Sequence, residues 1–128
     1  MTSALTTPAI EITQPLIDSL IALGGYTHPL FTPGTGAPMP GQAVLLLMGG
    51  LVEQSGLLDH AIALLELREV RFLQMLKADT TLHVELTPGK TDQTSTGKQI
   101  QHYTWTAINA AGTKILKAQA LMLTHRGM

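Results

Sequence analysis

One segment limits the fold more than any other. Residues Gln42 to Ser55, QAVLLLMGGLVEQS, are apolar on nearly every side of a helix. A surface helix carries a polar face, so this pattern predicts a helix that is buried on most sides. Gly49 and Gly50 lie in its middle, each costing about 1 kcal/mol relative to alanine. We expect close approach of another backbone to offset that cost, and Gly56 to end the helix.

After this helix the apolar spacing changes to two, the period of a β-strand. Short polar turns separate the later segments, which favours antiparallel strands in meander order. The residues between Thr91 and Lys98 are predicted to form a hairpin loop. The four predicted strands are Ala61 to Leu73, Thr81 to Thr87, Lys98 to Asn109 and Thr113 to His125.

The residues before the apolar helix predict a short strand, a helix and a loop. A brief strand is expected at 9–12. Thr13 is a candidate N-cap, Pro15 suits the first turn, and Gly24 and Gly25 would stop the helix. The stretch from Tyr26 to Gly41 then contains Pro29, Pro33, Pro38 and Pro40. Because proline restricts the backbone, we expect this loop to be ordered.

A single apolar helix followed by antiparallel strands predicts a sheet wrapped around a helix. We therefore expect one α+β domain of the hotdog kind over residues 1–128, because this length supports only one core. Such a sheet leaves an edge strand open, and pairing with a second copy would cover it. Only 13% of the residues are charged, against about 25% in typical soluble domains. Both features predict a homodimer or a higher homo-oligomer.

Charge and composition exclude several classes of function. The formal net charge of −1 gives no electrostatic basis for binding nucleic acid or an anionic membrane. The absence of cysteine excludes disulfides, thiolate catalysis and zinc–thiolate sites. The N-terminus lacks a basic start and a long apolar run, and the apolar stretch 43–52 is about half of what a bilayer crossing needs. We expect a cytoplasmic protein without a cofactor.

The motif order resembles the MaoC-like hydratase/dehydratase family. The matching residues are Gly24, His28-Pro29-Leu30, Pro40-Gly41, Arg71-Phe72 and Thr81-Leu82. The resemblance implies a hotdog dimer that acts on acyl thioesters carried by CoA or acyl-carrier protein. It implies hydration of a 2-enoyl-CoA or dehydration of a 3-hydroxyacyl-CoA, in which an Asp and a His handle a water molecule.

The chain departs from this family at both catalytic positions. Gly25 stands where the family has Asp, and Phe31 stands where it has His. Neither side chain can transfer a proton. Three functions therefore stay open: a divergent hydratase/dehydratase, a non-catalytic acyl-thioester-binding protein or inactive partner subunit, and a hotdog thioesterase.

The candidate site residues come from the loop and from the start of the apolar helix. His28 is a candidate acid/base, or else a loop histidine that bonds neighbouring backbone. Tyr26 could donate to a thioester carbonyl, or simply pack beside a helix end. Gly41 and Gln42 open the apolar helix, so their N–H groups are candidate donors to a polarised carbonyl. We include Phe31 with them as a substrate-binding residue.

Other polar clusters are interpreted as structural. Asp59 and His60 are adjacent, and adjacent strand residues point to opposite faces, so we expect a solvated connector there. His83, Glu85 and His102 lie at alternating strand positions and could approach one another. On a solvent-facing sheet such residues normally only cover the surface, so we expect no metal site.

Overall fold

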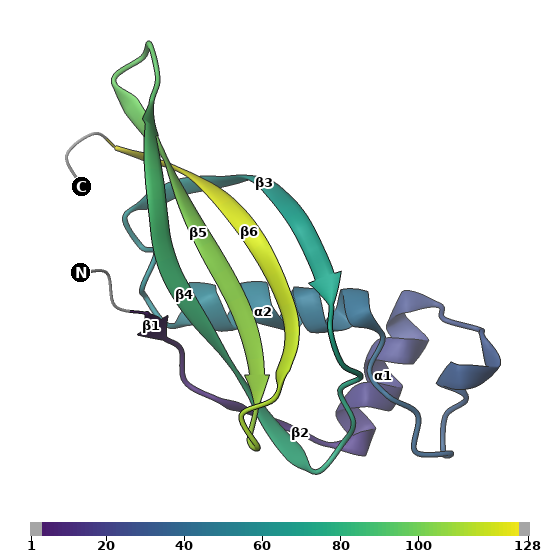
Figure 1. The fold of residues 1–128 in the computed structure, drawn as a ribbon. Coiled ribbons are helices and arrows are strands. Elements are labelled where there is room, and N and C mark those ends of the chain that lie inside the picture. Colours follow the sequence, from purple (N-terminus) through teal and green to yellow (C-terminus); the bar gives the residue numbers. More distant parts are fainter. Residues whose placement is uncertain (1–3, 126–128) are drawn as a thin grey trace.

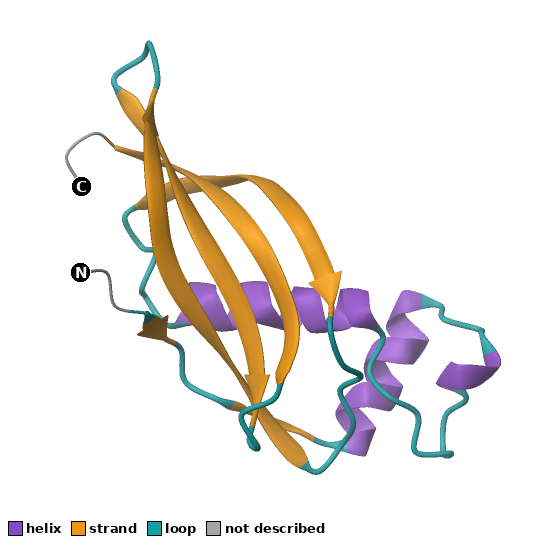
Figure 2. Cartoon of the chain, in the orientation of Figure 1, coloured by secondary structure: helices purple, strands orange, loops and turns teal. Residues whose placement is uncertain are grey.

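A curved antiparallel sheet lies across one long helix in the computed structural model, which describes residues 4–125. Figure 2 shows the strands on one side and the helices behind and beside them. The strand order is β1-β4-β5-β6-β3, and β2 also pairs with β4. The elements are β1 (Leu5–Thr6), β2 (Ile10–Ile12), α1 (Gln14–Gly24), η1 (Pro29–Phe31), α2 (Gly41–Gln54), β3 (Ala61–Phe72), β4 (Thr80–Gln93), β5 (Lys98–Asn109) and β6 (Lys114–His125).

Helix α1 begins and ends at the predicted signals. The Thr13 side chain accepts a hydrogen bond from the Leu16 N–H at 3.2 Å. Gly25 ends the helix with a φ of 71°, a left-handed conformation that side chains disfavour. Gly25 therefore serves a backbone role at the end of α1.

Helix α2 packs on the concave face of the sheet through one side only. Ala43, Val44, Met48, Leu51 and Val52 are buried. They meet alternate residues of the central strands, among them Leu86, Trp105, Leu116 and Ala118, all of which are buried. Burial of this kind contributes about 1.5–3 kcal/mol per large apolar side chain.

The prediction that α2 is buried on most sides is wrong within one chain. Leu46 is 66% exposed, and Gly50 is exposed as well. A Cβ at Gly49 or Gly50 would meet nothing within 4 Å, so no backbone within residues 4–125 approaches them. The sequence pattern reports how apolar the helix is, but not which molecule covers it.

The β4–β5 hairpin is longer than predicted. β4 continues to Gln93 instead of ending near Thr87, and only 94–97 separate the strands. A bulge between Pro88 and Thr91 interrupts the alternation, which hides the second half of the strand from a period-two search. Gln101 supports the bulge, because its amide donates to the Gly89 carbonyl at 3.0 Å.

Burial and charge pairing shift the pKa values of a few titratable groups on the sheet. Burial raises the pKa of the Tyr103 phenol. A hydrogen bond from His102 lowers the pKa of Asp92, and the Arg68 guanidinium lowers the pKa of Glu66.

Among residues 4–125, no helix is long and apolar enough to span a bilayer.

Candidate functional site

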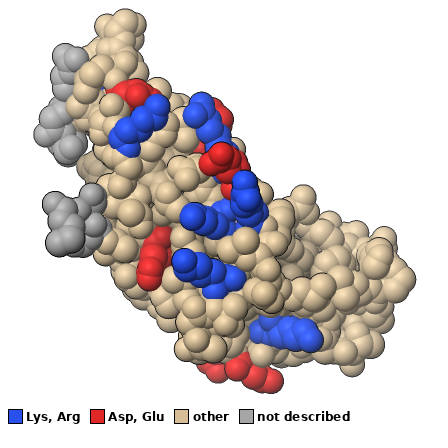
Figure 3. Space-filling view, in the orientation of Figure 1, with Lys and Arg blue, Asp and Glu red and all other residues tan. Residues whose placement is uncertain are grey.

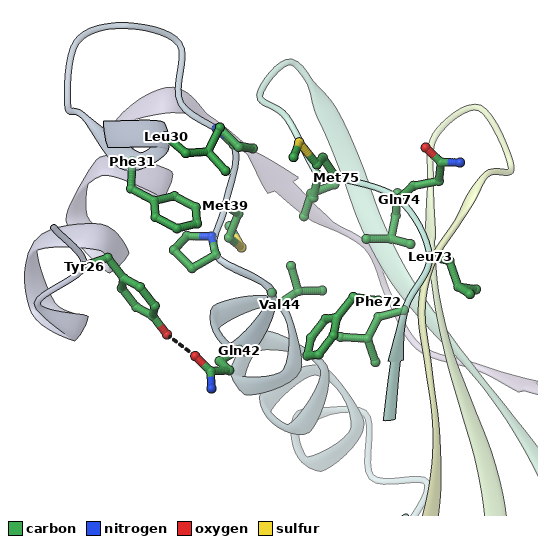
Figure 4. A pocket seen from close by; sticks show the side chains of 16 residues that line it. Tyr26, Leu30, Phe31, Met39, Gln42, Val44, Phe72, Leu73, Gln74 and Met75 are labelled. Carbon is green, nitrogen blue, oxygen red and sulfur yellow. Dashed lines mark hydrogen bonds between the residues drawn. The ribbon is translucent and has the colours of Figure 1, made fainter. Parts of the chain in front are cut away.

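A cleft of about 610 Å³ lies at the N-terminal end of α2. Figure 4 shows its walls, which come from the Tyr26–Gln42 loop, the first turn of α2, the segment after β3 and the start of β6. The lining is largely apolar, and its residues within the described chain include no carboxylate, imidazole, lysine or arginine. They are Tyr26, Leu30, Phe31, Pro38, Met39, Pro40, Gly41, Gln42, Val44, Phe72, Leu73, Gln74, Met75, Leu76, Ile115 and Leu116.

The first turn of α2 brings backbone N–H donors to the cleft. The N–H groups of Ala43 and Val44 both donate to the Pro40 carbonyl, at 2.9 and 3.1 Å. Pro40 provides no side-chain cap. Within the described chain, no acceptor meets the N–H groups of Gly41 and Gln42. These two donors also sit at the positive end of the helix dipole, so they favour an anion or a polarised carbonyl.

Tyr26 and Gln42 form a polar pair on one wall. The Tyr26 hydroxyl donates to Gln42 Oε1 at 2.8 Å, the dashed contact in Figure 4. The Tyr26 ring also packs edge-on against Phe31, with ring centroids 5.5 Å apart. The loop is therefore tied to the first turn of α2, and the hydrogen bond leaves the side-chain amide N–H groups of Gln42 available.

Phe72 forms the opposite wall and lies directly against Gly41. A Cβ at Gly41 would be 2.5 Å from Cδ1 of the Phe72 ring, closer than real atoms approach. A larger residue at position 41 would therefore require the Phe72 ring to move. Phe72 is itself 55% exposed, so its ring is packed on one side and open on the other.

His28 lies outside the cleft lining. Its side chain is exposed, and its Nδ1 accepts a hydrogen bond from the Leu30 N–H at 3.1 Å. It thereby caps η1, which matches the backbone-bonding role weighed for it. The structure brings together Tyr26, Phe31, Gly41 and Gln42 at the cleft but leaves His28 outside it.

Sequence reasoning missed the wall from Phe72 to Met75. The sequence did contain a signal for this wall, because the mostly apolar stretch Phe72-Leu73-Gln74-Met75 continues past the end of the β3 pairing. Phe72, Leu73 and Met75 are large apolar side chains that remain exposed. Exposed apolar residues grouped in this way mark a binding surface more often than scattered ones do.

The polar clusters considered for metal binding are spread over the outer face of the sheet. His83 and Glu85 are two positions apart in β4, so they share a face of the sheet. Their pairing partners in β5 are Ile108 and Thr106, which are not metal ligands of the expected kind. His102 instead contacts Asp92, with Nε2 and Oδ2 2.9 Å apart. Among residues 4–125, no group of three or more histidines and carboxylates could hold a metal ion.

Comparison with known proteins identifies solved structures with the same fold. No family model and no curated protein sequence matches the chain. Among solved structures, a MaoC-like dehydratase from Rhodospirillum rubrum superposes with a TM-score of 0.84 at 16% identity, over 100% of this chain and 94% of that one. A monoamine oxidase regulatory protein from Archaeoglobus fulgius gives 0.84 at 18%, over 100% and 92%. The chain has the hotdog fold of the MaoC-like dehydratases.

An (R)-hydratase from A. caviae involved in PHA biosynthesis has the same hotdog fold. Its TM-score is 0.73 at 14% sequence identity, and the match covers 97% of this chain and 95% of that chain. The resemblance seen in the motifs is therefore confirmed at the level of fold.

A second groove, of about 920 Å³, runs along the exposed side of α2 beside β3. Gln42 lines this groove as well as the cleft, so both hollows border the first turn of α2. Trp105 also lines it, and the indole N–H of Trp105 is buried with no acceptor among the described residues. The remaining lining is mostly aliphatic, including Leu45, Leu46, Leu64 and Leu67.

Proposed function

We propose that this hotdog protein binds an acyl thioester, with the thioester carbonyl at the N–H groups of Gly41 and Gln42. The observation that carries this is that Gly41 and Gln42, whose backbone N–H groups have no acceptor among the described residues, line an apolar cleft. Two such donors at a helix N-terminus stabilise an oxygen that carries negative charge. The aliphatic walls suit an acyl chain, and the fold likeness to a dehydratase and an (R)-hydratase supports the same ligand class.

The proposed role of a single chain is binding without hydration or dehydration. Such chemistry needs a group that moves a proton within hydrogen-bond reach of the substrate. The described residues lining the cleft include no carboxylate or imidazole, and the exposed His28 side chain bonds backbone. In this proposal the chain holds the thioester and transfers no proton to it.

Hydration by the chain itself is the second candidate. Tyr26 and Gln42 favour it, because a phenol and an amide 2.8 Å apart at the helix start could hold a water molecule. The two candidates predict different outcomes with a short 2-enoyl-CoA. Binding alone gives thermal stabilisation without product, whereas hydration gives a 3-hydroxyacyl product. Release of free thiol would identify a thioesterase.

We also propose a homodimer formed through β3 and the exposed side of α2. β3 is a 12-residue edge strand, and long open edges are normally paired or covered. Ile62, Leu64 and Leu65 on β3 are exposed, as is Leu46 on α2. A second copy would cover these residues and the second groove together.

The donor role of α2 is tested with a matched pair of variants at one position. Gln42→Pro removes the backbone N–H, and proline is tolerated in the first turn of a helix. Gln42→Ala keeps that N–H and removes only the side chain. We expect Gln42→Pro to weaken binding of a non-hydrolysable acyl-CoA analogue about tenfold, which corresponds to the loss of about one hydrogen bond between neutral groups, measured by calorimetry.

Gln42→Ala should bind within about threefold of the unmodified protein, with circular dichroism confirming that both variants fold. Equal affinity for the two variants would remove the backbone donors from the site. Equal loss in both would assign binding to the Gln42 side chain.

A further inference from the structure

The cleft gathers aromatic rings in a chain that has few of them. The sequence contains two phenylalanines, two tyrosines and one tryptophan. Tyr103 and Trp105 are buried against the core, whereas Tyr26, Phe31 and Phe72 all line the cleft. In Figure 4, Tyr26 and Phe31 lie on one wall and Phe72 on the other, with the start of α2 between them. All the phenyl and phenol rings that the core leaves unburied are therefore at this cleft.

A bulge in β3 turns the Phe72 side chain toward the cleft. Between positions 68 and 71, β3 contains one residue more than β6 opposite it. Glu69 lies in this bulge with a φ of 50°, a left-handed conformation that is uncommon for a residue with a side chain. Leu67, before the bulge, pairs with the fully buried Ala120, so unbroken alternation would place Phe72 on the outer face. The extra residue instead lets Phe72 pair with the fully buried Leu116 and face inward.

Core packing does not account for this placement of Phe72. The inward-facing ring is 55% exposed, since only one side of it meets Gly41. Figure 1 shows this end of β3 beside the start of α2. The exposed residues assigned to a second copy, Ile62 to Leu65, lie at the opposite end of the strand. Bulges next to binding sites re-aim side chains, and the strained bulge at Glu69 indicates that the position of the Phe72 ring serves the cleft.

The facing wall is held in place before any ligand binds. The Phe31 ring packs edge-on against both Tyr26 and His28, with ring centroids 5.5 and 6.4 Å apart. The Tyr26 hydroxyl is bonded to the Gln42 side chain. Rings therefore flank the N–H groups of Gly41 and Gln42 on both sides. The atoms bonded to a carbonyl at those N–H groups would lie between the two walls.

The surroundings of the cleft carry almost no charge. Between positions 12 and 52 the sequence contains a single lysine, arginine, aspartate or glutamate, which is Asp18. In the view of Figure 3, the surface formed by α1 and the loop after it shows no charged side chain. The part of a ligand that enters the cleft is therefore expected to be uncharged.

We propose, resting on the proposed function, that the bound acyl group carries an uncharged aromatic ring close to the thioester carbonyl, as a phenylpropanoyl group does. Aromatic rings that meet edge-on or offset gain free energy beyond the burial of their area. The sulfur atoms of Met39 and Met75, two further lining residues, also make favourable contacts with rings. A straight saturated chain gains burial alone. Phe72 is thus the residue that determines the preference for an aromatic acyl group.

The test compares two pantetheine probes in which a methylene group replaces the thioester sulfur, so that neither can be hydrolysed. One carries a phenylpropanoyl group, and the other carries a nonanoyl group with the same number of carbon atoms. Calorimetry should show that the unmodified protein binds the phenylpropanoyl probe at least about tenfold more tightly. Phe72→Tyr keeps a ring and should keep this preference. Phe72→Leu keeps an apolar side chain without a ring, and it should bind the phenylpropanoyl probe about fivefold more weakly while nonanoyl binding changes less than about twofold.

The role of the bulge is tested with a second pair of variants. Glu69→Gly keeps the extra residue and fits the positive φ, so it should keep the preference for the phenylpropanoyl probe. Deletion of Glu69 restores unbroken alternation and should reduce the preference as Phe72→Leu does. Circular dichroism confirms that each variant folds.

Three results would overturn the inference: equal binding of the two probes by the unmodified protein, tighter binding of the nonanoyl probe, or the same preference in Phe72→Leu and Phe72→Tyr. In each of these results an acyl probe still binds, so the proposed acyl site would stand. Failure of both probes to bind would contradict the proposed function itself, and the Gln42 variants test that site separately.

Discussion

Two glycine sites on helix α2 have opposite surroundings. At Gly41 a Cβ would lie 2.5 Å from the Phe72 ring, whereas at Gly50 it would meet nothing within 4 Å. At the helix start, a larger residue would have to displace a neighbour that is present in the structure. In the middle of the helix, glycine costs about 1 kcal/mol relative to alanine, and no neighbour among the described residues accounts for it.

The difference divides the helix into two functional regions. At the start of α2, contacts from the same chain cover the helix, through Phe72 and the Tyr26–Gln42 hydrogen bond. The exposed side, with Leu46 and Gly50, would be buried only if another molecule covered it. The predicted close approach at Gly49 and Gly50 therefore becomes a prediction about a second copy, in which absent side chains let two helices come near one another.

Leu46→Glu should have the largest effect, because it places a charge in the proposed interface. Burying an unpaired carboxylate costs several kcal/mol, so we expect the dimer dissociation constant to rise more than about 100-fold. Sedimentation equilibrium measures it directly. Leu23→Glu is the matched control, since Leu23 lies on α1 and is even more exposed, at 84%.

The control should leave the assembly unchanged. A Leu46→Glu protein that remains as dimeric as the unmodified chain would place the interface elsewhere. A monomeric unmodified protein would leave the exposed side of α2 without a partner.

Alanine substitution at the two glycine sites should act in opposite directions on the folding of one chain. Gly41→Ala overpacks against Phe72 and should lower the free energy of unfolding by about 1–3 kcal/mol. Phe72→Ala added to it should recover most of that loss, which a double-mutant cycle in urea would measure. Gly50→Ala should raise monomer stability by about 1 kcal/mol in the Leu46→Glu background.

In the dimeric protein, by contrast, Gly50→Ala should weaken association if two helices meet there. Stabilisation in both backgrounds would show that no helix approaches Gly50. Additive effects of Gly41→Ala and Phe72→Ala would contradict the contact between them.

The sequence predicted elements whose signals are local. Thr13 and Gly25 mark the ends of α1 because capping depends on one residue and its neighbours. The sheet around α2 followed from alternation in β5 and β6. Two features could not be predicted in this way. The bulge at Pro88 breaks the period of β4, and an apolar pattern cannot show whether Leu46 is covered by its own chain.

The candidate site was predicted in part for the same reason. Tyr26, Phe31, Gly41 and Gln42 come from one continuous stretch of sequence, and they do line the cleft. Phe72 and Ile115 reach it from distant strands, and only the sheet register brings them together. His28 lay within the right stretch, but its short-range bond to the Leu30 N–H holds its side chain outside the lining.

Trp105→Phe should have the smallest effect and tests the exposed region of α2 most finely. The buried indole N–H has no acceptor among the described residues, which costs about 1–3 kcal/mol. Phenylalanine removes this donor but also part of the ring packing, so the two terms nearly cancel. We expect the unfolding free energy of the monomeric Leu46→Glu background to change by less than about 1 kcal/mol, measured by urea denaturation.

The effect of Trp105→Phe on the proposed dimer should be compared with its effect on the monomer, because Trp105 lines the groove that a second copy would cover. If the partner supplies an acceptor to the indole N–H, Trp105→Phe should raise the dissociation constant about tenfold while leaving monomer stability unchanged. An unchanged dissociation constant would mean that the donor stays unpaired in the assembly. A large loss of monomer stability would instead show that the ring contributes mainly by packing against α2.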